Sequence, residues 1–239
     1  MLSAIAIVPS APLLVPQLVG AAADELTNLR RAVFAAAGAL PQQWVAIGVG
    51  PADEFVGPEA AGTFAGYGVD VRVGLSPDAD TVGELPLCAL VTGWVRSHAR
   101  PAARAEVRVV AHTAEGDDAL RCGRDLRSTI DAADHDVGVL VVADGANTLT
   151  ARAPGGYDSE SVAVQSALDD ALASGDVAAL ARLPGSISGR VAWQVLAGLA
   201  RTPPRSVKEL YRGAPFGVGY FVGVWVPEGR SEATGELTE

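Results

Sequence analysis

Apolar and polar positions follow one another along the chain in blocks of two kinds. Short runs rich in valine, isoleucine and aromatic residues are typical of β-strands, and they occupy residues 2–8, 44–50, 69–75, 106–112, 137–143 and 218–226. The run VGVLVVA (137–143) is apolar throughout, as expected of a strand that is covered on both faces. Longer Ala- and Leu-rich segments separate these runs. The alternation predicts an α/β fold with a central, mostly parallel sheet and helices on both faces.

The longest of the helical segments covers residues 22–40. Its apolar residues recur with the period of a helix and fall on one face, which is formed by Leu26, Leu29, Val33 and Ala36. We expect that face to lie on the sheet. Residues 85–98 predict a second, more buried helix.

Two further segments carry signals for helix starts. Residues 113–133 form an amphipathic pattern with acids in the first turns, where the helix dipole favours them, and Thr113 is the expected N-cap. Ser206 lies three residues before Glu209, the spacing of a capping box, so SVKELY (206–211) predicts a short helix.

The chain shows no internal repeat and no linker that would divide it. We therefore expect residues 1–228 to form one domain and the polar segment GRSEATGELTE (229–239) to be an acidic, disordered tail. The breaker-rich segment 151–161 directly follows the strand 137–143. It is expected over the carboxyl edge of the sheet, where open α/β sheets bind their ligands.

Charge and composition narrow the range of partners. The 239 residues include 18 Lys and Arg against 28 Asp and Glu, a net charge of -10 that repels phosphate backbones and anionic lipids. No nucleic-acid partner is expected. Prolines interrupt the apolar N-terminus and the first basic residue is Arg30, so no signal peptide is expected. No uninterrupted apolar segment reaches ~18 residues, so no membrane partner is expected either. Cys88 and Cys122 form no CxxC pair, which fits a reducing cytoplasm.

Polar residues that could carry chemistry lie just beyond two of the predicted strands. Ser10 stands in VPSAPLLVP, where the first strand runs into a proline-rich loop. Asp144 and Asn147 stand in VADGANTL at the carboxyl end of the most apolar strand. Glycine, aspartate and asparagine also suit an ordinary turn there.

Weaker candidates follow two other strands. Asp53 and Glu54 lie beyond the strand 44–50, but adjacent acids point in different directions and suit a solvated loop better than a paired acid/base device. His112 ends the strand 106–112, and the three histidines of the chain have no metal-ligand spacing.

Four stretches together resemble the LigB-type class III extradiol ring-cleavage dioxygenases. They are AIVPSAPLLVPQL, LVVADGANTLTARAPGGYD, GRVAWQVLAGLA and YRGAPFGVGYFVGVW, and their order and spacing cover most of the chain. The resemblance implies a LigB-like fold. Active members of that family hold a non-haem Fe(II) with two histidines and a glutamate, and a further histidine acts as acid and base in opening an aromatic ring.

The positions that match these ligands carry other residues here. Ser10 occupies the position of the first metal histidine, and Gly50 lies where the second is expected. Asn147 occupies the position of the acid/base histidine, and residues 186–194, where the metal glutamate is expected, contain no carboxylate. A hydroxyl, a hydrogen and a carboxamide are not strong Fe(II) ligands. The resemblance therefore implies a degenerate protein that needs no cofactor, cleaves no ring, and binds a small molecule in a remnant cleft that includes Ser10, Gly50, Asp144 and Asn147.

Two alternatives stay open. The first is an enzyme with altered chemistry, or with a metal held by non-standard ligands such as Asp53, Glu54, Asp144 or His112. The second is a structural or interaction subunit in which the cleft is filled. An open, polar cleft would favour binding or catalysis over the second alternative.

The C-terminal strand 218–226 suggests a partner of a different kind. Tyr220, Phe221 and Trp225 give it more large apolar surface than an exposed strand usually carries, which predicts a homo-oligomer. Burial of the same side chains under a helix is the alternative.

Overall fold

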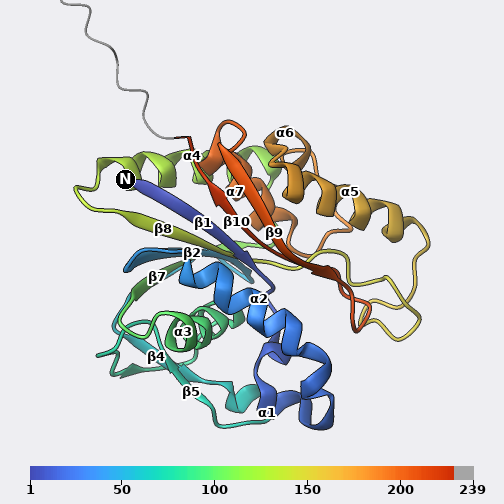
Figure 1. Cartoon of the computed structure of the whole chain (residues 1–239), viewed down its shortest axis with the longest axis horizontal. Coiled ribbons are helices and arrows are strands. Elements are labelled where there is room, and N and C mark those ends of the chain that lie inside the picture. The colour runs from blue at the N-terminus through green and yellow to red at the C-terminus, as the bar shows by residue number, and fades with distance from the viewer. Residues whose placement is uncertain (229–239) are drawn as a thin grey trace, which may run out of the picture.

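The computed structural model describes residues 1–228, apart from the side chains of residues 21 and 22, so the predicted acidic tail lies outside the described residues. Its central feature is a seven-stranded sheet of order β3-β7-β2-β8-β1-β10-β9 (Figure 1). The strands are β1 (Leu2–Val8), β2 (Gln43–Gly50), β3 (Glu54–Val56), β7 (Arg104–Ala111), β8 (Val137–Val142), β9 (Ser206–Gly213) and β10 (Tyr220–Val226).

The middle of this sheet is parallel and its edges are antiparallel. Strands β7, β2, β8 and β1 run parallel to one another, whereas β3 pairs antiparallel with β7, β10 with β1, and β9 with β10. The prediction that the runs 2–8, 44–50 and 137–143 form neighbouring parallel strands is confirmed. Because the four central strands are parallel, their carboxyl ends meet at one edge of the sheet.

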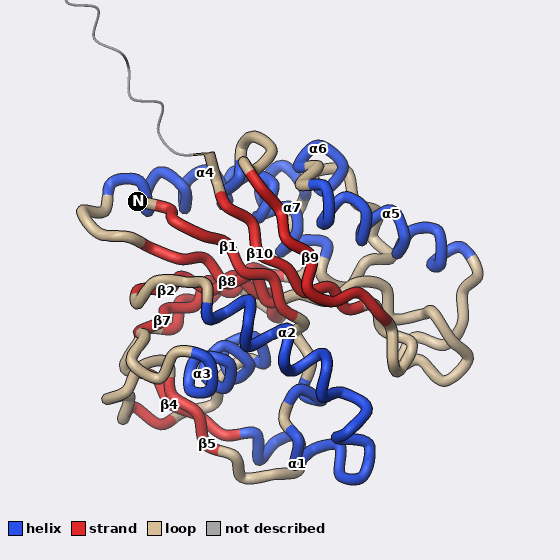
Figure 2. The backbone as a smooth tube through the Cα atoms, viewed as in Figure 1, coloured by secondary structure: helices blue, strands red, loops and turns tan. Residues whose placement is uncertain are grey.

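Helices cover both faces of the sheet, as predicted (Figure 2). One face carries α2 (Thr27–Gly38) and α3 (Leu87–Ala99). The other carries α4 (Gly116–Ala132), α5 (Glu160–Ser174), α6 (Val177–Leu180) and α7 (Arg190–Ala200). The predicted apolar face of residues 22–40 is buried on the sheet, although its first turns form a 3-10 segment, Gly20–Leu26, and the α-helix begins only at Thr27.

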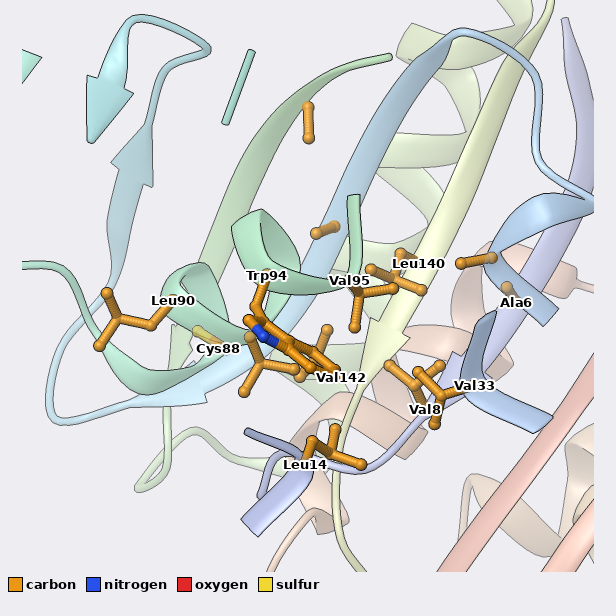
Figure 3. Close-up of a cluster of buried hydrophobic side chains, with 14 of the residues drawn as sticks. Ala6, Val8, Leu14, Val33, Cys88, Leu90, Trp94, Val95, Leu140 and Val142 are labelled. Carbon is orange, nitrogen blue, oxygen red and sulfur yellow. The ribbon is translucent and has the colours of Figure 1, made fainter. Parts of the chain in front are cut away.

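The cores on the two faces follow from the alternation of side chains along each strand. In β1, Ala6 and Val8 point towards α2 and α3, while Ile5 and Ile7 point towards the opposite layer. Figure 3 shows the first of these cores, where Trp94 of α3 packs among apolar side chains of α2, β1 and β8. Strands covered on both faces need apolar residues at every position, which explains the continuous run in β8.

A smaller three-stranded sheet lies beside α3. It consists of β4 (Ala60–Thr63), β5 (Arg72–Gly74) and β6 (Thr81–Val82), in the order β5-β4-β6. The predicted strand 69–75 is therefore shortened to β5. Val73 at its centre is buried close to Gly93 of α3.

The predicted helix in SVKELY is wrong. These residues belong to β9, an edge strand that pairs along its whole length with β10, Val207 lying opposite Trp225. A capping-box spacing is a local signal, and hydrogen bonds to a neighbouring strand outweigh it. The N-cap of α4 is also corrected, because Glu115 occupies that position and Thr113 lies in the preceding turn, where Ala114 N–H bonds the Ala111 carbonyl.

The aromatic residues of β10 do not form an exposed surface. This strand lies between β1 and β9, and Tyr220, Phe221 and Trp225 are all buried. The indole Nε1 of Trp225 donates a hydrogen bond to the carbonyl of Leu172 in α5, 2.9 Å away. Burial under a helix accounts for these side chains, so the reason for expecting self-association through them no longer holds.

Candidate functional site

A cavity of about 580 Å³ opens beyond the carboxyl ends of β1 and β8. Ser10 follows β1, and Asp144 and Asn147 follow β8, so the parallel pairing of these two strands brings the three residues together. Its other walls come from the proline-rich loop, the short helices after it, and residues far along the chain. These further lining residues are Ala11, Pro12, Leu13, Leu18, Val19, Tyr67, Leu87, Pro154, Ser188, Val218 and Tyr220.

The proline-rich loop turns away from the sheet for a local reason. Proline has no backbone N–H to donate to a sheet, so Pro9 ends β1. Two short helical turns, Pro12–Leu14 and α1 (Pro16–Val19), then each begin with a proline, whose fixed φ suits the first helical position. The chain thus folds back over the strand ends and forms one wall of the cavity.

Ser10 and Asp144 are directly linked. The backbone N–H of Ser10 donates a hydrogen bond to Oδ1 of Asp144 over 2.8 Å. Asp144 is half-buried at the cavity wall, and its removal from water raises the pKa of its carboxyl from 3.8 to about 7, while the bond from Ser10 acts in the opposite direction. Burial also raises the pKa of the Tyr220 phenol, and the nearby Asp144 charge adds to that effect.

The backbone around Asp144 is held from two sides. Its carbonyl oxygen accepts hydrogen bonds from the N–H of Gly189, at 3.0 Å, and from the indole Nε1 of Trp193, at 3.2 Å. The side chain of Gln165 accepts a 2.7 Å hydrogen bond from the N–H of Ala146 and donates one of 2.8 Å to Asp169. These partners lie on α5, on α7 and at the residue just before α7, and their hydrogen bonds hold the Asp144 segment at the cavity.

Sequence reasoning missed several parts of this site. Tyr67, Ser188 and Tyr220 line the cavity, and Gln165 supports it from behind. Only Gln165 carried a signal, because it lies four residues before Asp169, a spacing that places the two polar side chains side by side on one helix face. The others converge from separate parts of the chain.

Gly50 does not line the cavity with Ser10, Asp144 and Asn147. Its carbonyl accepts a 2.9 Å hydrogen bond from the N–H of His112. A Cβ added at Gly50 would lie 2.5 Å from a methyl group of Val109, closer than such contacts allow. The Val109 side chain of β7 therefore occupies the space where a side chain at position 50 would begin.

The weaker candidates lie in a different place. Asp53 and Glu54 line a second cavity of about 780 Å³ between α4 and the β3/β7 edge, with Arg108 and Cys122. Asp53 accepts a 2.7 Å hydrogen bond from the N–H of Ala111. His112 is exposed, with Nδ1 3.1 Å from the Gly50 carbonyl oxygen, and it lines neither cavity. The structure does not bring these residues together with Asp144.

The donor atoms around the first cavity do not suit Fe(II). Ser10, Asp144 and Asn147 supply one carboxylate and no imidazole, whereas non-haem iron sites use two histidines and a carboxylate with open positions. Across residues 1–228, no group of three or more His, Cys, Asp and Glu side chains is placed to hold a metal ion. The site that the family resemblance implies therefore lacks the ligand set for its metal.

Comparison with known proteins supports the fold alone. No family model matches the sequence, and no curated protein matches it. The chain is similar to the crystal structure of the uncharacterized protein JW3007 from Escherichia coli K12, with a TM-score of 0.57 and 10% sequence identity over 94% of this chain and 99% of that chain. Among the described residues, no helix has the length and apolar character needed to cross a membrane. The chain therefore has an α/β fold that is already known from a solved structure.

Proposed function

We propose that this protein is a degenerate LigB-like protein that binds a small organic molecule without a metal and does not cleave aromatic rings. One observation carries the proposal: the residues that the resemblance assigns to the metal and to acid/base chemistry, Ser10 and Asn147, line an open cavity together with Asp144 but provide no imidazole. The cavity falls in the size range of small-molecule sites and combines an apolar lining with a few polar groups.

The geometry weighs against a structural subunit and against an enzyme that holds a metal through non-standard ligands. A structural subunit with a filled cleft would not keep a space of about 580 Å³ at the strand ends. A metal held jointly by Asp144 and by Asp53, Glu54 or His112 would need these residues at one site, and they lie elsewhere. A binding site is the function that the geometry supports best.

Metal content and ring cleavage test the negative half of the proposal. The protein is purified, reconstituted anaerobically with Fe(II), analysed for bound iron and assayed with catechol and oxygen. We expect no stoichiometric iron and no ring-cleavage product, and Ser10→His alone should not change this because it supplies one ligand of a set. Stoichiometric iron with catechol cleavage that is lost on changing Ser10 or Asn147 would overturn the proposal.

Fragment binding tests the positive half. A neutral and charged fragment set is screened by NMR, and hits are repeated with Leu18→Trp, which fills the cavity, and with Val162→Trp, which adds the same indole on the exposed face of α5. Hits should be lost in the first variant and kept in the second. Equal binding to both variants, or no hits at all, would contradict a binding site in this cavity.

A further inference from the structure

Asp144 is the one charged side chain among the cavity-lining residues of the described chain. The polar remainder consists of uncharged hydroxyl and amide groups, from Ser10, Tyr67, Asn147, Ser188 and Tyr220, and every other lining residue is apolar. Neither a lysine, an arginine nor a histidine belongs to the lining. The electrostatic character of the cavity is therefore decided by one carboxyl group.

That carboxyl group has a single polar partner in the described structure. Its Oδ1 atom accepts the N–H of Ser10 at 2.8 Å, and no salt bridge within residues 1–228 involves Asp144. Carboxylates removed from water are usually paired with a cation, because desolvation alone is costly. Among residues 1–228, Asp144 lacks such a partner, and it faces a cavity large enough for a ligand.

The rest of the lining suits the other parts of an organic cation. Tyr67 and Tyr220 provide aromatic rings, whose faces attract positive charge. Leu13, Leu18 and Val218 provide apolar contacts for a hydrocarbon body. The arrangement places an acceptor of positive charge at one wall of an otherwise apolar space.

We infer that the cavity takes a small organic cation, a protonated amine attached to an apolar or aromatic body, with the ammonium group bound by Asp144. This inference rests on the proposed function, because it names the class of ligand for the same site. A carboxylate or phosphate ligand is disfavoured, since its charge would meet Asp144 with no cation to offset the repulsion. A neutral alcohol fits the space but leaves the carboxylate unpaired.

Three probes of similar size separate these classes. 2-Phenylethylamine, 2-phenylethanol and phenylacetate share one ring and chain length and carry positive, zero and negative charge at pH 8. Their affinities are measured by calorimetry and by NMR titration of the full chain. We expect the amine to bind at least about tenfold tighter than the alcohol, equivalent to about 1.4 kcal/mol, and phenylacetate to bind most weakly.

Two matched variants test whether Asp144 is responsible. Asp144→Asn keeps the shape and removes the charge. Asp53→Asn makes the same change at another aspartate that follows a parallel strand and accepts a backbone N–H, in the second cavity. The amine preference should disappear in the first variant and persist in the second. If the preference persists in Asp144→Asn, or vanishes in Asp53→Asn, the assignment to Asp144 is overturned.

The outcomes also distinguish this inference from the proposed function. Tighter binding of the alcohol or of phenylacetate by the unmodified protein would overturn the cation assignment while leaving a small-molecule site in place. Binding of none of the three probes would overturn the cation assignment too. Loss of every hit in the fragment screen as well would remove the proposed function with it.

Discussion

Replacing Asp144 by asparagine should make the protein's stability less dependent on pH, with a sign that the structure fixes. Burial raises the pKa of this carboxyl from 3.8 to about 7 in the folded state. Between these values the folded state holds the proton more tightly than the unfolded state, so the free energy of unfolding falls as pH rises through this window. Asparagine does not titrate. The variant should therefore gain stability relative to the unmodified protein from pH 4 to pH 8.

The size of the effect follows from the shift in pKa. The pKa of Asp144 rises by about 3, and at ~1.36 kcal/mol per pKa unit this corresponds to at most about 4 kcal/mol of the free energy of unfolding. Asp144 is half-buried and faces an open cavity, so water and ions reduce this value, and we expect about 2 kcal/mol. The asparagine oxygen can still accept the N–H of Ser10, which keeps the local structure.

Urea unfolding of both proteins at pH 4, 6 and 8, at constant ionic strength, measures the difference in the free energy of unfolding. Asp78→Asn provides a control of opposite sign. Asp78 is exposed, and its 2.6 Å hydrogen bond from Arg104 lowers the pKa of its carboxyl, so it stabilises the fold above the ordinary carboxyl range. That variant should lose stability relative to the unmodified protein as pH rises through the carboxyl range.

Two results would contradict a desolvated Asp144 carboxyl. If the difference between Asp144→Asn and the unmodified protein stays constant from pH 4 to pH 8, the carboxyl is not desolvated in the folded state. If Asp144→Asn instead loses stability relative to the unmodified protein as pH rises, a cation of the protein pairs with Asp144. Either result would also remove the electrostatic basis for a cationic ligand.

Three further predictions concern the scaffold. Gly48→Ala should lower the free energy of unfolding in urea by about 1–3 kcal/mol, because the new Cβ would overlap the Cys88 side chain. Gly38→Ala on α2 is the control: open space surrounds Gly38, so this variant should raise the free energy of unfolding by up to about 1 kcal/mol. Gln165→Leu should lower the free energy of unfolding by about 1–3 kcal/mol, because it leaves the buried N–H of Ala146 without a partner. Coincident urea unfolding curves for the variant and the unmodified protein would contradict this. Burial raises the pKa of the Cys88 thiol to about 12, so iodoacetamide should not label it in the native protein. Peptide mapping measures this labelling, and rapid labelling of Cys88 would contradict its burial.

Much of the scaffold could be predicted from the sequence because its signals are local or periodic. Apolar runs located β1, β2, β8 and β10, and the 3.6-residue period located α2 and α4. Local signals failed where a partner strand decided the outcome. The segment SVKELY has the start of a helix by its own residues, yet antiparallel pairing with β10 makes it a strand.

The candidate site could be predicted only in part, for a related reason. Ser10, Asp144 and Asn147 each stand at a strand end that the sequence reveals, and the parallel pairing of β1 with β8 brings them to one cavity. Asp53, Glu54 and His112 also stand near strand ends, yet they do not line this cavity. Sequence position alone does not distinguish the two groups, because the order of strands in the sheet determines which ends are neighbours.

The sequence by itself determined the α/β class, the two-sided burial of the central strands, and the residue types that stand where the LigB resemblance assigns metal ligands, since all three depend on residue identity and on spacing along the chain. Only the tertiary structure decided that Tyr67, Ser188 and Tyr220 join Asp144 around one cavity. It also decided that the Val109 side chain lies against Gly50 and that, within residues 1–228, no salt bridge pairs Asp144 with a cation. These features depend on distances between residues far apart in the chain, and such distances are set by how strands pair and helices pack.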